Sequence, residues 1–557
     1  MNWRYRLLLI FFIILFGIVI IRLFYWQIVK AQELSDLGQQ QYGQALTVPA
    51  ERGEIRTSDG FPIATNKISY VVFANPKEIK DKQEIINTLA PILNVDPASI
   101  SASLSLDLFW VELGKADEVK KNQIAKLNLP GIDFKQEYSR FYPEASMAAQ
   151  LIGFVGKDDL GQDKGYFGLE GYYDRLLTGK DGKALEIHDA FGKPVLAKID
   201  NSSGQTNGSN LILSVDRSIQ FLVENVLKES VEEYGATSGM IGIMDPKTGM
   251  ILAMASYPNY DPRDYQTYSE SLFINPFVTD TYEPGSTFKP LVMSSALDAK
   301  LIKPETKCPI CAGPVSVGGY SIETWNNEYF KNTTMTEVIQ HSDNTGMVFV
   351  AQKLGLDRML DYLNKFGIGN ATGIDLQGEV SPELKPKNQW YAADLATTGF
   401  GQGISVTPIE LLSAISAIAN DGKRMEPHVV SEVENPDGTS IKLEPKVLDQ
   451  PIDSETAKVM TEMMVNAVEK GEASWTKLKG YRVAGKTGTA SIALNGTYDS
   501  SKTIASFVGF APADDPKFSM LVILNKPTTS IYGAETAAPV FFSIAKDLLL
   551  YYGISPN

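Results

Sequence analysis

Three short motifs, separated by long stretches of chain, constrain the fold of this sequence more than any other feature. They are Ser286–Lys289, Ser342–Asn344 and Lys486–Thr489, in this order within about two hundred residues. Together they contain a hydroxyl nucleophile, an amine that can act as its base, a polar relay and a cationic segment that can seat a carboxylate. A fold that uses these groups in one reaction must bring all of them around a single cleft.

The first motif has the composition of a helix start. A Pro-Gly pair breaks the preceding structure, and we expect Ser286 to open a helix that continues to Leu297. Residues three apart share one helical face, so Ser286 Oγ and Lys289 Nζ can meet. The backbone N–H of Ser286 can face a developing oxyanion. The alternative is a capping serine followed by a solvated lysine, and Ser474–Lys477 has the same spacing without such a setting.

Histidine is scarce, which makes lysine the better candidate for the base. The sequence contains only His188, His341 and His428, and each is interpreted as a surface or packing residue. No Gly-x-Ser-x-Gly elbow supports a Ser-His-Asp triad. A lysine base must be a free amine, so Lys289 should be partly desolvated and crowded by a second cation, both of which lower its pKa.

The third motif supplies that second cation. Tyr481–Gly485 is expected to lead into it as a strand edge, and Gly488 allows a substrate to approach the backbone closely. The Lys486 ammonium, with the hydroxyls of Thr487 and Thr489, can hold a C-terminal carboxylate. The backbone N–H of Thr489 can complete an oxyanion hole.

The middle motif follows a predicted helix at Met335–His341 and precedes an apolar one. Ser342 can relay a proton to a leaving amine, and Asn344 can hydrogen-bond both a substrate amide and Lys289. A plain helix cap is the alternative.

The third motif has its own alternative, a glycine turn beside a surface lysine. Lys247–Gly249 matches that turn but precedes the serine motif.

The N-terminal segment predicts a membrane anchor. Leu7–Ile21 is apolar apart from one glycine, and Tyr5–Trp26 reaches the roughly 20 residues that cross a bilayer. Arg4 and Arg6 predict a cytoplasmic N-terminus. A cleaved signal peptide is the alternative, but the residues at positions 24–29 are too bulky for a cleavage site. Nearly all of the chain should therefore lie outside the cytoplasm.

Composition excludes some other classes. A net charge of −15 over 557 residues argues against a nucleic-acid surface. The only cysteines, Cys308 and Cys311, form one pair, whereas a structural zinc site takes four ligands. We interpret them as a small loop staple or as two idle thiols.

The chain is expected to be organised as an anchor at 1–30, a mixed α/β region at 31–210 and an α+β domain at 211–557. The polar, turn-rich run at 201–210 marks the boundary between the last two. Strands at both ends of the last region, with helices between them, predict an antiparallel sheet covered by the terminal helices. The individual elements expected there are a strand at 211–215, a helix at 218–234, a hairpin of 240–244 with 250–254, strands at 482–484, 504–510 and 518–524, and a closing helix at 537–551.

With these motifs in view, the chain resembles the monofunctional class B penicillin-binding proteins. The resemblance extends over nearly the whole sequence. The other motifs that match this family are Arg52–Ile55, Gly165–Glu170, Leu177–Gly182, Gly399–Gly403, Val406–Pro408 and Ile418–Gly422.

The resemblance implies a pedestal domain and a β-lactamase-like serine transpeptidase domain that cross-links peptidoglycan. By carry-over, Ser286 attacks the penultimate D-alanine carbonyl of a stem peptide, and Lys289 is the general base. Ser342 and Asn344 complete the proton network, and the motif from Lys486 binds the carboxylate. β-Lactams would acylate the same serine, and no metal or organic cofactor is implied.

The resemblance also implies partners. Glycan polymerisation would come from a separate SEDS-type polymerase. The anchor and pedestal would contact this polymerase and other division membrane proteins. The stretch Asp280–Ser286 is more similar to division-specific than to elongation-specific members. The alternatives are an elongation-specific transpeptidase, a β-lactamase, which would not need the pedestal, and a catalytically idle β-lactam sensor or scaffold.

Overall fold

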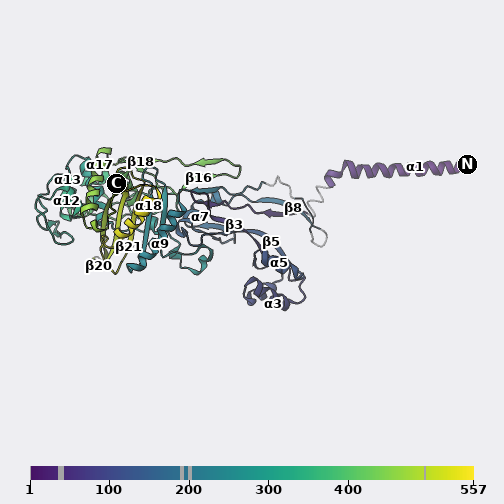
Figure 1. Ribbon diagram of the computed structural model, residues 1–557. Coiled ribbons are helices and arrows are strands. Elements are labelled where there is room, and N and C mark those ends of the chain that lie inside the picture. The colour runs from purple at the N-terminus through teal and green to yellow at the C-terminus, as the bar shows by residue number, and fades with distance from the viewer. Residues whose placement is uncertain (1, 35–42, 189–193, 199–203, 495–496, 557) are drawn as a thin grey trace. The chain divides into compact units, whose positions relative to one another are not determined.

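The computed structural model describes residues 2–34, 43–188, 194–198, 204–494 and 497–556 (Figure 1). The chain divides into two units that interleave along the sequence, and each is described by itself. The first unit comprises Met1–Arg52, Ser69–Tyr138 and Thr178–Gly208, and the second comprises Gly53–Ile68, Ser139–Leu177 and Ser209–Asn557.

The N-terminal helix of the first unit agrees with the predicted apolar segment. Helix α1, Trp3–Phe24, continues into a π-helical turn at Tyr25–Val29. No residue of either element is buried, and together they are long and apolar enough to cross a membrane. This segment is therefore a candidate membrane span.

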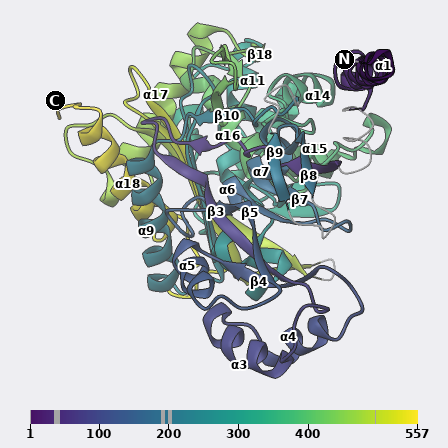
Figure 2. The ribbon, with the colours of Figure 1, turned by 90° about the vertical axis from the view of Figure 1, so that its right-hand side faces the viewer.

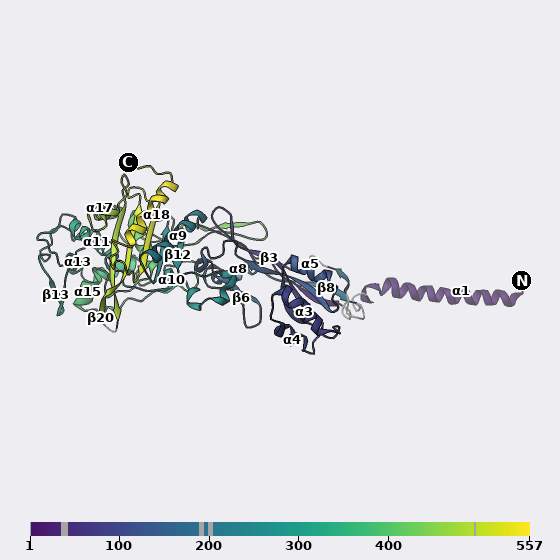
Figure 3. The same cartoon turned by 60° about the horizontal axis from the view of Figure 1, so that its bottom comes forward.

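The rest of the first unit is mixed α/β, as expected. Its core lies where α3 and α4 pack together beside β4 (Figure 3). The side chains of Asp81 and Asp96 cap α3 and α4 by accepting from backbone N–H groups. The elements are β1 Gly43–Val48, α3 Lys82–Leu93, α4 Pro97–Leu104, β4 Val111–Ala116, α5 Glu118–Lys126, β5 Ile132–Phe141, whose residues 139–141 belong to the second unit, β8 Gly182–His188 and β9 Pro194–Lys198. Strands β1, β8 and β9 form one antiparallel sheet.

The second unit begins with short elements held by a buried ion pair. Arg140 donates from Nε to Glu170 Oε1 at 2.6 Å and from Nη1 to the Gly53 carbonyl at 2.8 Å. Two motifs quoted for the family resemblance, Arg52–Ile55 and Gly165–Glu170, thus contain residues that meet at one arginine. The elements are β2 Ile55–Arg56, β3 Pro62–Ala74, whose residues 69–74 belong to the first unit, α6 Ala149–Ile152, β6 Phe154–Lys157, β7 Asp163–Tyr166, α7 Gly168–Tyr172, α8 Asp174–Leu177 and β10 Asn210–Leu213.

A five-stranded antiparallel sheet organises the second unit. Its order is β12-β11-β21-β20-β19, so the strand that carries Lys486 lies at an edge. The expected hairpin is confirmed, with Met240 opposite Ser256 and Ile243 opposite Ala253. The strands are β11 Ser238–Met244, β12 Ile251–Tyr257, β19 Ala484–Leu494, β20 Thr497–Ala511 and β21 Phe518–Asn525.

The terminal helices cover one face of this sheet, as predicted. Figure 2 shows α9, Arg217–Glu233, beside α18, Ala537–Tyr551. Apolar side chains of both helices, among them Val223 and Phe541, form one core cluster with Phe507 of β20. The spacing of these apolar residues produces the stripe that each helix buries.

Helices from the middle of the chain form the rest of the core, and α11, α13 and α15 gather together in Figure 3. The helices are α10 Pro276–Thr279, α11 Lys289–Asp298, α12 Met335–Gln340, α13 Asn344–Leu354, α14 Leu356–Lys365, α15 Ala392–Thr398, α16 Pro408–Ala419 and α17 Ser454–Lys470. The short strands are β13 Val315–Val317, β14 Tyr320–Ile322, β15 Arg424–Met425, β16 Val430–Glu434, β17 Ser440–Lys442 and β18 Val447–Asp449. Cys308 and Cys311 form a disulfide, which corresponds to the staple alternative.

Two predicted boundaries are wrong. Ser286 does not open an α-helix directly, because Gly285–Phe288 is a 3-10 turn (η4) and α11 begins at Lys289. Residues 481–483 are not in a strand, since β19 begins at Ala484. The cationic motif therefore lies inside a strand at the edge of the sheet.

Candidate active site

Ser286 is held on a tight turn that leads into α11. Gly285 has a φ of +57° and donates its N–H to the Gly401 carbonyl at 2.9 Å. A Cβ at Gly401 would lie 2.1 Å from the Gly285 carbonyl oxygen, so this close approach requires a glycine. Gly401 belongs to the Gly399–Gly403 motif, whose role in the site is thus to support the turn that bears the serine.

The first two motifs meet through hydrogen bonds. Ser342 Oγ donates to Ser286 Oγ at 2.9 Å. Lys289 Nζ donates to Ser342 Oγ at 3.2 Å, to the Ser342 carbonyl at 2.5 Å and to Asn344 Oδ1 at 2.8 Å. The Ser342 hydroxyl therefore lies between the amine and the Ser286 hydroxyl. The contact between Ser286 and Lys289 expected from helical spacing is replaced, in this structure, by a relay through Ser342.

The Lys289 amine is fully buried, and its surroundings lower its pKa to about 7. Desolvation is the main cause because burial disfavours the ammonium, and the nearby Lys486 ammonium adds to it. The carboxylates of Asp343 and Glu472 act in the opposite direction. A lysine in this state can accept a proton near neutral pH.

The second motif contains both a serine hydrogen-bonded to Ser286 and Lys289 and the helix cap considered as an alternative. Asp343 is the N-cap of α13 and accepts from the N–H groups of Thr345 and Gly346. Ser342, with a φ of +56°, directs its hydroxyl to Ser286 instead. Asn344 Nδ2 donates to the Glu323 carbonyl at 2.9 Å, which orients its Oδ1 toward Lys289.

The third motif lies on the facing strand. Lys486 Nζ donates to Thr487 Oγ1 at 2.9 Å and to the Thr487 carbonyl at 3.2 Å. Burial lowers the pKa of Lys486, and Glu472 opposes this shift. Thr489 Oγ1 accepts from the Gly533 N–H at 3.0 Å. A Cβ at Gly488 would lie 2.3 Å from Ser506 Oγ and 2.8 Å from Thr287 Cγ2, so the close approach at this glycine is to other parts of the chain.

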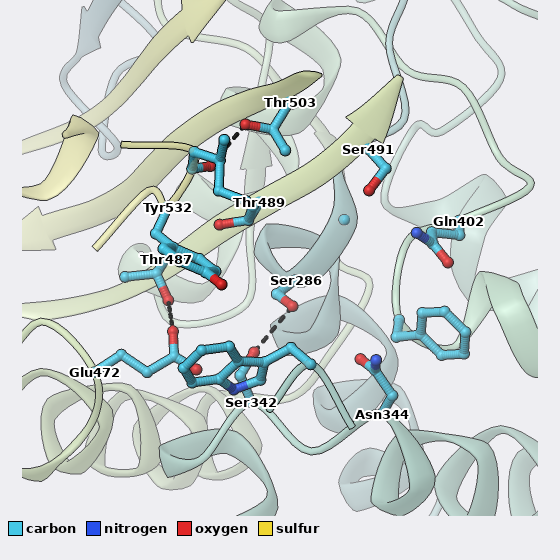
Figure 4. Close-up of a pocket in the computed structure, with 14 residues that line it drawn as sticks. Ser286, Ser342, Asn344, Gln402, Glu472, Thr487, Thr489, Ser491, Thr503 and Tyr532 are labelled. Carbon is cyan, nitrogen blue, oxygen red and sulfur yellow. Dashed lines mark hydrogen bonds between the residues drawn. The ribbon is translucent and has the colours of Figure 1, made fainter. Parts of the chain in front are cut away.

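These segments surround one cavity of about 300 Å³. Figure 4 shows Ser286 at its centre, with Ser342 and Asn344 on one side and Thr487 and Thr489 on the opposite strand. Lys289 and Lys486 do not line this cavity themselves, but they are hydrogen-bonded to Ser342 and Thr487, which do. The sequence predicts no role in the site for the remaining lining residues, which are Gly285, Trp325, Phe400, Gln402, Glu472, Ser491, Thr503, Ile531 and Tyr532.

Two of these residues, Phe400 and Gln402, could have been found from the sequence, because they lie in the Gly399–Gly403 motif that matches the family. Glu472 and Trp325 had no such signal, because each comes from a loop whose position depends on the packing of distant elements. His341 lines a second cavity of about 200 Å³, together with Glu472 and Asp343. Among the residues that the structure describes, no group of three or more His, Cys, Asp and Glu could hold a metal ion.

Comparison with known proteins assigns the family. The family model of the penicillin binding protein transpeptidase domain matches residues 239–546, more than half of the chain. The chain belongs to the class B penicillin-binding proteins. A second family model, the penicillin-binding protein dimerisation domain, matches residues 47–213.

Individual relatives agree with this assignment. The chain is 35% identical to stage V sporulation protein D of Bacillus subtilis, over all of this chain and 87% of that protein. It is 30% identical to the peptidoglycan D,D-transpeptidase FtsI of Escherichia coli, over all of this chain and 93% of that protein. Its fold is similar to that of penicillin binding protein 3 of Mycobacterium tuberculosis in complex with aztreonam. The TM-score is 0.72 at 26% identity, covering 92% of this chain and 98% of the other.

Proposed function

We propose that this protein is a serine-dependent D-alanyl-D-alanine transpeptidase that cross-links peptidoglycan stem peptides. The observation that carries the proposal is the hydrogen-bonded series of Ser286, Ser342 and Lys289 inside one cleft, opposite the strand of Lys486. FtsI of Escherichia coli is a peptidoglycan D,D-transpeptidase by name and aligns over the whole chain.

In the proposed acylation step, Ser286 Oγ attacks the carbonyl carbon of the penultimate D-alanine. Its proton passes through the Ser342 hydroxyl to the neutral Lys289 amine, because Ser342 lies between them. The proton then returns through Ser342 to the nitrogen of the terminal D-alanine as the peptide bond breaks. An ester on Ser286 remains, and D-alanine leaves.

In the second step the amine of a neighbouring stem peptide attacks this ester. The amine loses a proton to the same relay, the new amide bond forms, and Ser286 recovers its hydroxyl hydrogen. Lys289 acts as base in the attack and supplies the proton when the ester breaks, which suits a group whose pKa is about 7.

The carboxylate of the terminal D-alanine is proposed to bind at Lys486, Thr487 and Thr489. Thr487 and Thr489 line one side of the cleft opposite Ser286, and the buried ammonium of Lys486 lies behind them, donating to Thr487 Oγ1. The backbone N–H groups of Ser286 and Thr489 are proposed as the oxyanion donors, a kind of donor whose loss typically costs about 10²–10³ in rate. Gly488 contributes by keeping the strand close to the serine turn.

β-Lactams should acylate Ser286 because their strained amide presents a carbonyl and a carboxylate in the same arrangement. The structural relative from Mycobacterium tuberculosis holds the β-lactam aztreonam. The direct test is labelling of the purified protein with fluorescent penicillin. We expect covalent labelling of the native chain and none of the Ser286→Ala variant, because the ester cannot form without the hydroxyl.

The chain supplies a matched control for this test. Ser474 and Lys477 reproduce the spacing of Ser286 and Lys289 in another 3-10 turn, outside the cleft lining. Ser474→Ala should therefore label like the native protein. Labelling of Ser286→Ala at the native level would refute the assignment of the nucleophile.

The remaining regions are proposed to position this domain at the membrane. We infer an anchor at 1–30 with a cytoplasmic N-terminus, an extracytoplasmic pedestal at 31–210 and a transpeptidase domain at 211–557. The candidate span supports the anchor, and the family models at 47–213 and 239–546 support the division into domains. The anchor and pedestal are the proposed contacts to a SEDS-type glycan polymerase and other division membrane proteins.

The cellular process is proposed to be division, because FtsI aligns over the whole chain and the serine motif is similar to division-specific members. The relative from Bacillus subtilis is named for sporulation, which makes a sporulation role the second candidate. The complete set of catalytic groups argues against an idle β-lactam sensor.

Depletion of the protein in growing cells, followed by imaging, separates these processes. Filaments are expected for a division enzyme, because septal cross-linking stops while elongation continues. Rounded cells would indicate elongation. Normal vegetative growth with a failure only in spores would indicate the sporulation role.

A further inference from the structure

Glu472 is a carboxylate in the active-site cleft that the mechanism above does not use. It follows α17 in a turn and lines the cavity that contains Ser286 (Figure 4). A Cβ on the preceding Gly471 would lie 2.3 Å from the Ala467 carbonyl oxygen and 2.7 Å from that of Gln340. The backbone is therefore tightly packed just before Glu472, and this packing fixes where the Glu472 side chain enters the cleft.

The carboxylate is bonded to the group proposed to bind substrate. Thr487 Oγ1 donates to Glu472 Oε2 at 3.1 Å and accepts from Lys486 Nζ at 2.9 Å. The other oxygen, Glu472 Oε1, is buried and has no hydrogen-bond partner among the described residues. A buried carboxylate oxygen without a donor is costly, which indicates a functional rather than a stabilising role.

This arrangement affects the proposed carboxylate site in two ways. A hydroxyl carries one hydrogen, so Thr487 cannot donate to Glu472 and to a substrate carboxylate at the same time. In addition, a second carboxylate a few ångströms away repels the first, and the repulsion is strong in a poorly hydrated cleft. Both effects weaken the binding of an anionic substrate group.

We propose that Glu472 is a specificity-determining residue that reduces the affinity of the cleft for the terminal carboxylate of its substrates and of β-lactams. This inference rests on the proposed function and adds that Glu472 limits how tightly the same site binds a carboxylate. The carboxylate that binds beside Lys486 belongs to the D-alanine that must leave, so weaker binding assists its release before the acceptor amine arrives. Binding that is equally strong before and during the reaction would not accelerate the chemical step.

Among the described residues, no other charged group near Glu472 could exert the same repulsion on a carboxylate bound in the cleft. Lys486 and Lys289 are the buried cations of the site, and Glu472 opposes the lowering of the pKa of both. Asp343 caps α13 through Oδ1, and its Oδ2 is also buried without a hydrogen-bond partner among the described residues, but Asp343 does not line the cavity that contains Ser286. The remaining titratable groups around the adjoining cavity are Glu328, His341 and Lys470. None of these three lines the cavity that contains Ser286.

The test compares one ligand with and without its carboxylate. Rates of acylation by benzylpenicillin and by its methyl ester are measured on the native protein, Glu472→Gln and Glu469→Gln. The glutamine is nearly isosteric, removes the charge and can donate to Thr487 Oγ1, which frees the threonine hydrogen for the ligand. Glu469 is an exposed carboxylate near the end of α17, the helix that precedes Glu472, and serves as the matched control.

We expect Glu472→Gln to raise the second-order acylation rate by benzylpenicillin about tenfold and that by the ester less than about twofold, since only the anion feels the repulsion. Glu469→Gln should match the native protein with both ligands. Equal gains with both ligands, no gain, or a loss with benzylpenicillin would overturn the inference. If Glu472→Gln does not fold, Glu472→Ala removes the same charge and is judged by the same ratio.

This experiment separates the inference from the function on which it rests. Acylation of Ser286 in the native protein and in both glutamine variants supports the proposed function, whatever the ratio between ligands. A native protein that penicillin does not acylate refutes the proposed function, and with it this inference. A native protein that is acylated, with an unchanged ratio in Glu472→Gln, refutes only the role of Glu472.

Discussion

At the scale of single residues, the site depends on two buried lysines, one of which lowers the pKa of the other. Lys289 and Lys486 are 0% and 3% exposed, respectively. Burying an ammonium is costly unless it is hydrogen-bonded. Lys289 donates to Ser342 and Asn344 of the second motif, and Lys486 donates to Thr487 of its own motif. The remaining cost appears as a lowered pKa, so the same burial that lowers stability provides Lys289 with a basic form near neutral pH.

This pKa predicts the pH dependence of acylation. Only the neutral amine of Lys289 can accept the Ser286 proton, and its pKa is about 7. The acylation rate with penicillin should rise by about tenfold per pH unit well below that value and level off above it. Measurements from acidic to alkaline pH test this, and a rate that does not change below neutrality would contradict the role of Lys289.

Substitution of the neighbouring lysine tests the cause of the shift. Lys486→Ala removes the cation that, after desolvation, lowers the pKa of Lys289. The inflection of the pH profile should therefore move to higher pH, and acylation at its plateau should weaken because the carboxylate loses its counter-charge. Lys477→Ala, at an exposed lysine outside the cleft lining, is the control and should leave both quantities unchanged.

At the scale of elements, the site forms where β19 packs against the turn that bears Ser286. Gly488 lies opposite Ser506 on β20 and has no room for a side chain, since Thr287 of the turn lies within contact distance. Because Gly488 has no side chain, the strand and the turn can pack in direct contact, and this contact fixes their relative position. This packing keeps Thr487 and Thr489 on the same cavity as Ser286.

Adding one methyl group at this contact should damage the site more than the fold. In Gly488→Ala the new Cβ would lie 2.3 Å from Ser506 Oγ and 2.8 Å from Thr287 Cγ2. We expect overpacking to cost about 1–3 kcal/mol of stability and the displaced strand to reduce penicillin labelling about tenfold or more. Thermal unfolding and labelling rates measure the two effects.

The control for this variant is a glycine with free space. Gly313 has no atom within 4 Å of the position of a Cβ and no positive φ. Gly313→Ala should label like the native protein. Native labelling by Gly488→Ala would show that the contact between strand and turn does not position the site.

At the scale of the whole molecule, the candidate membrane span and the site belong to different units of the chain. The span is Trp3–Val29, whereas every residue that lines the cavity of Ser286 belongs to the second unit. The five-stranded sheet and the helices that support the site are also drawn from the second unit alone (Figure 1). Acylation should therefore not need the apolar helix.

Deletion of residues 1–30 tests this separation. The shortened protein should remain soluble without detergent, because an exposed apolar helix is removed. It should also react with fluorescent penicillin at the rate of the detergent-solubilised full chain. A shortened protein that folds but no longer reacts would mean that the anchor contributes to the site.

The sequence by itself determined the groups available for chemistry and the elements with a strong local signal. The apolar helix, the hairpin of β11 with β12 and helices α9 and α18 follow from apolar spacing and turn residues, which act within a few positions of the chain. The order of the three motifs, with a lysine in place of a histidine base, was sufficient for the family resemblance. Its domain boundaries and the roles of its site residues remain predictions.

Tertiary structure alone decided how these groups meet. That Ser342 connects Ser286 to Lys289 depends on packing between helices whose contacting residues are more than fifty positions apart. The glycine at 488 serves contacts with Thr287 and Ser506, and Glu472 enters the cleft from a turn without any motif. Local sequence patterns report local conformation, whereas the pKa of a lysine or the partner of a hydroxyl depends on neighbours that only the folded chain brings together.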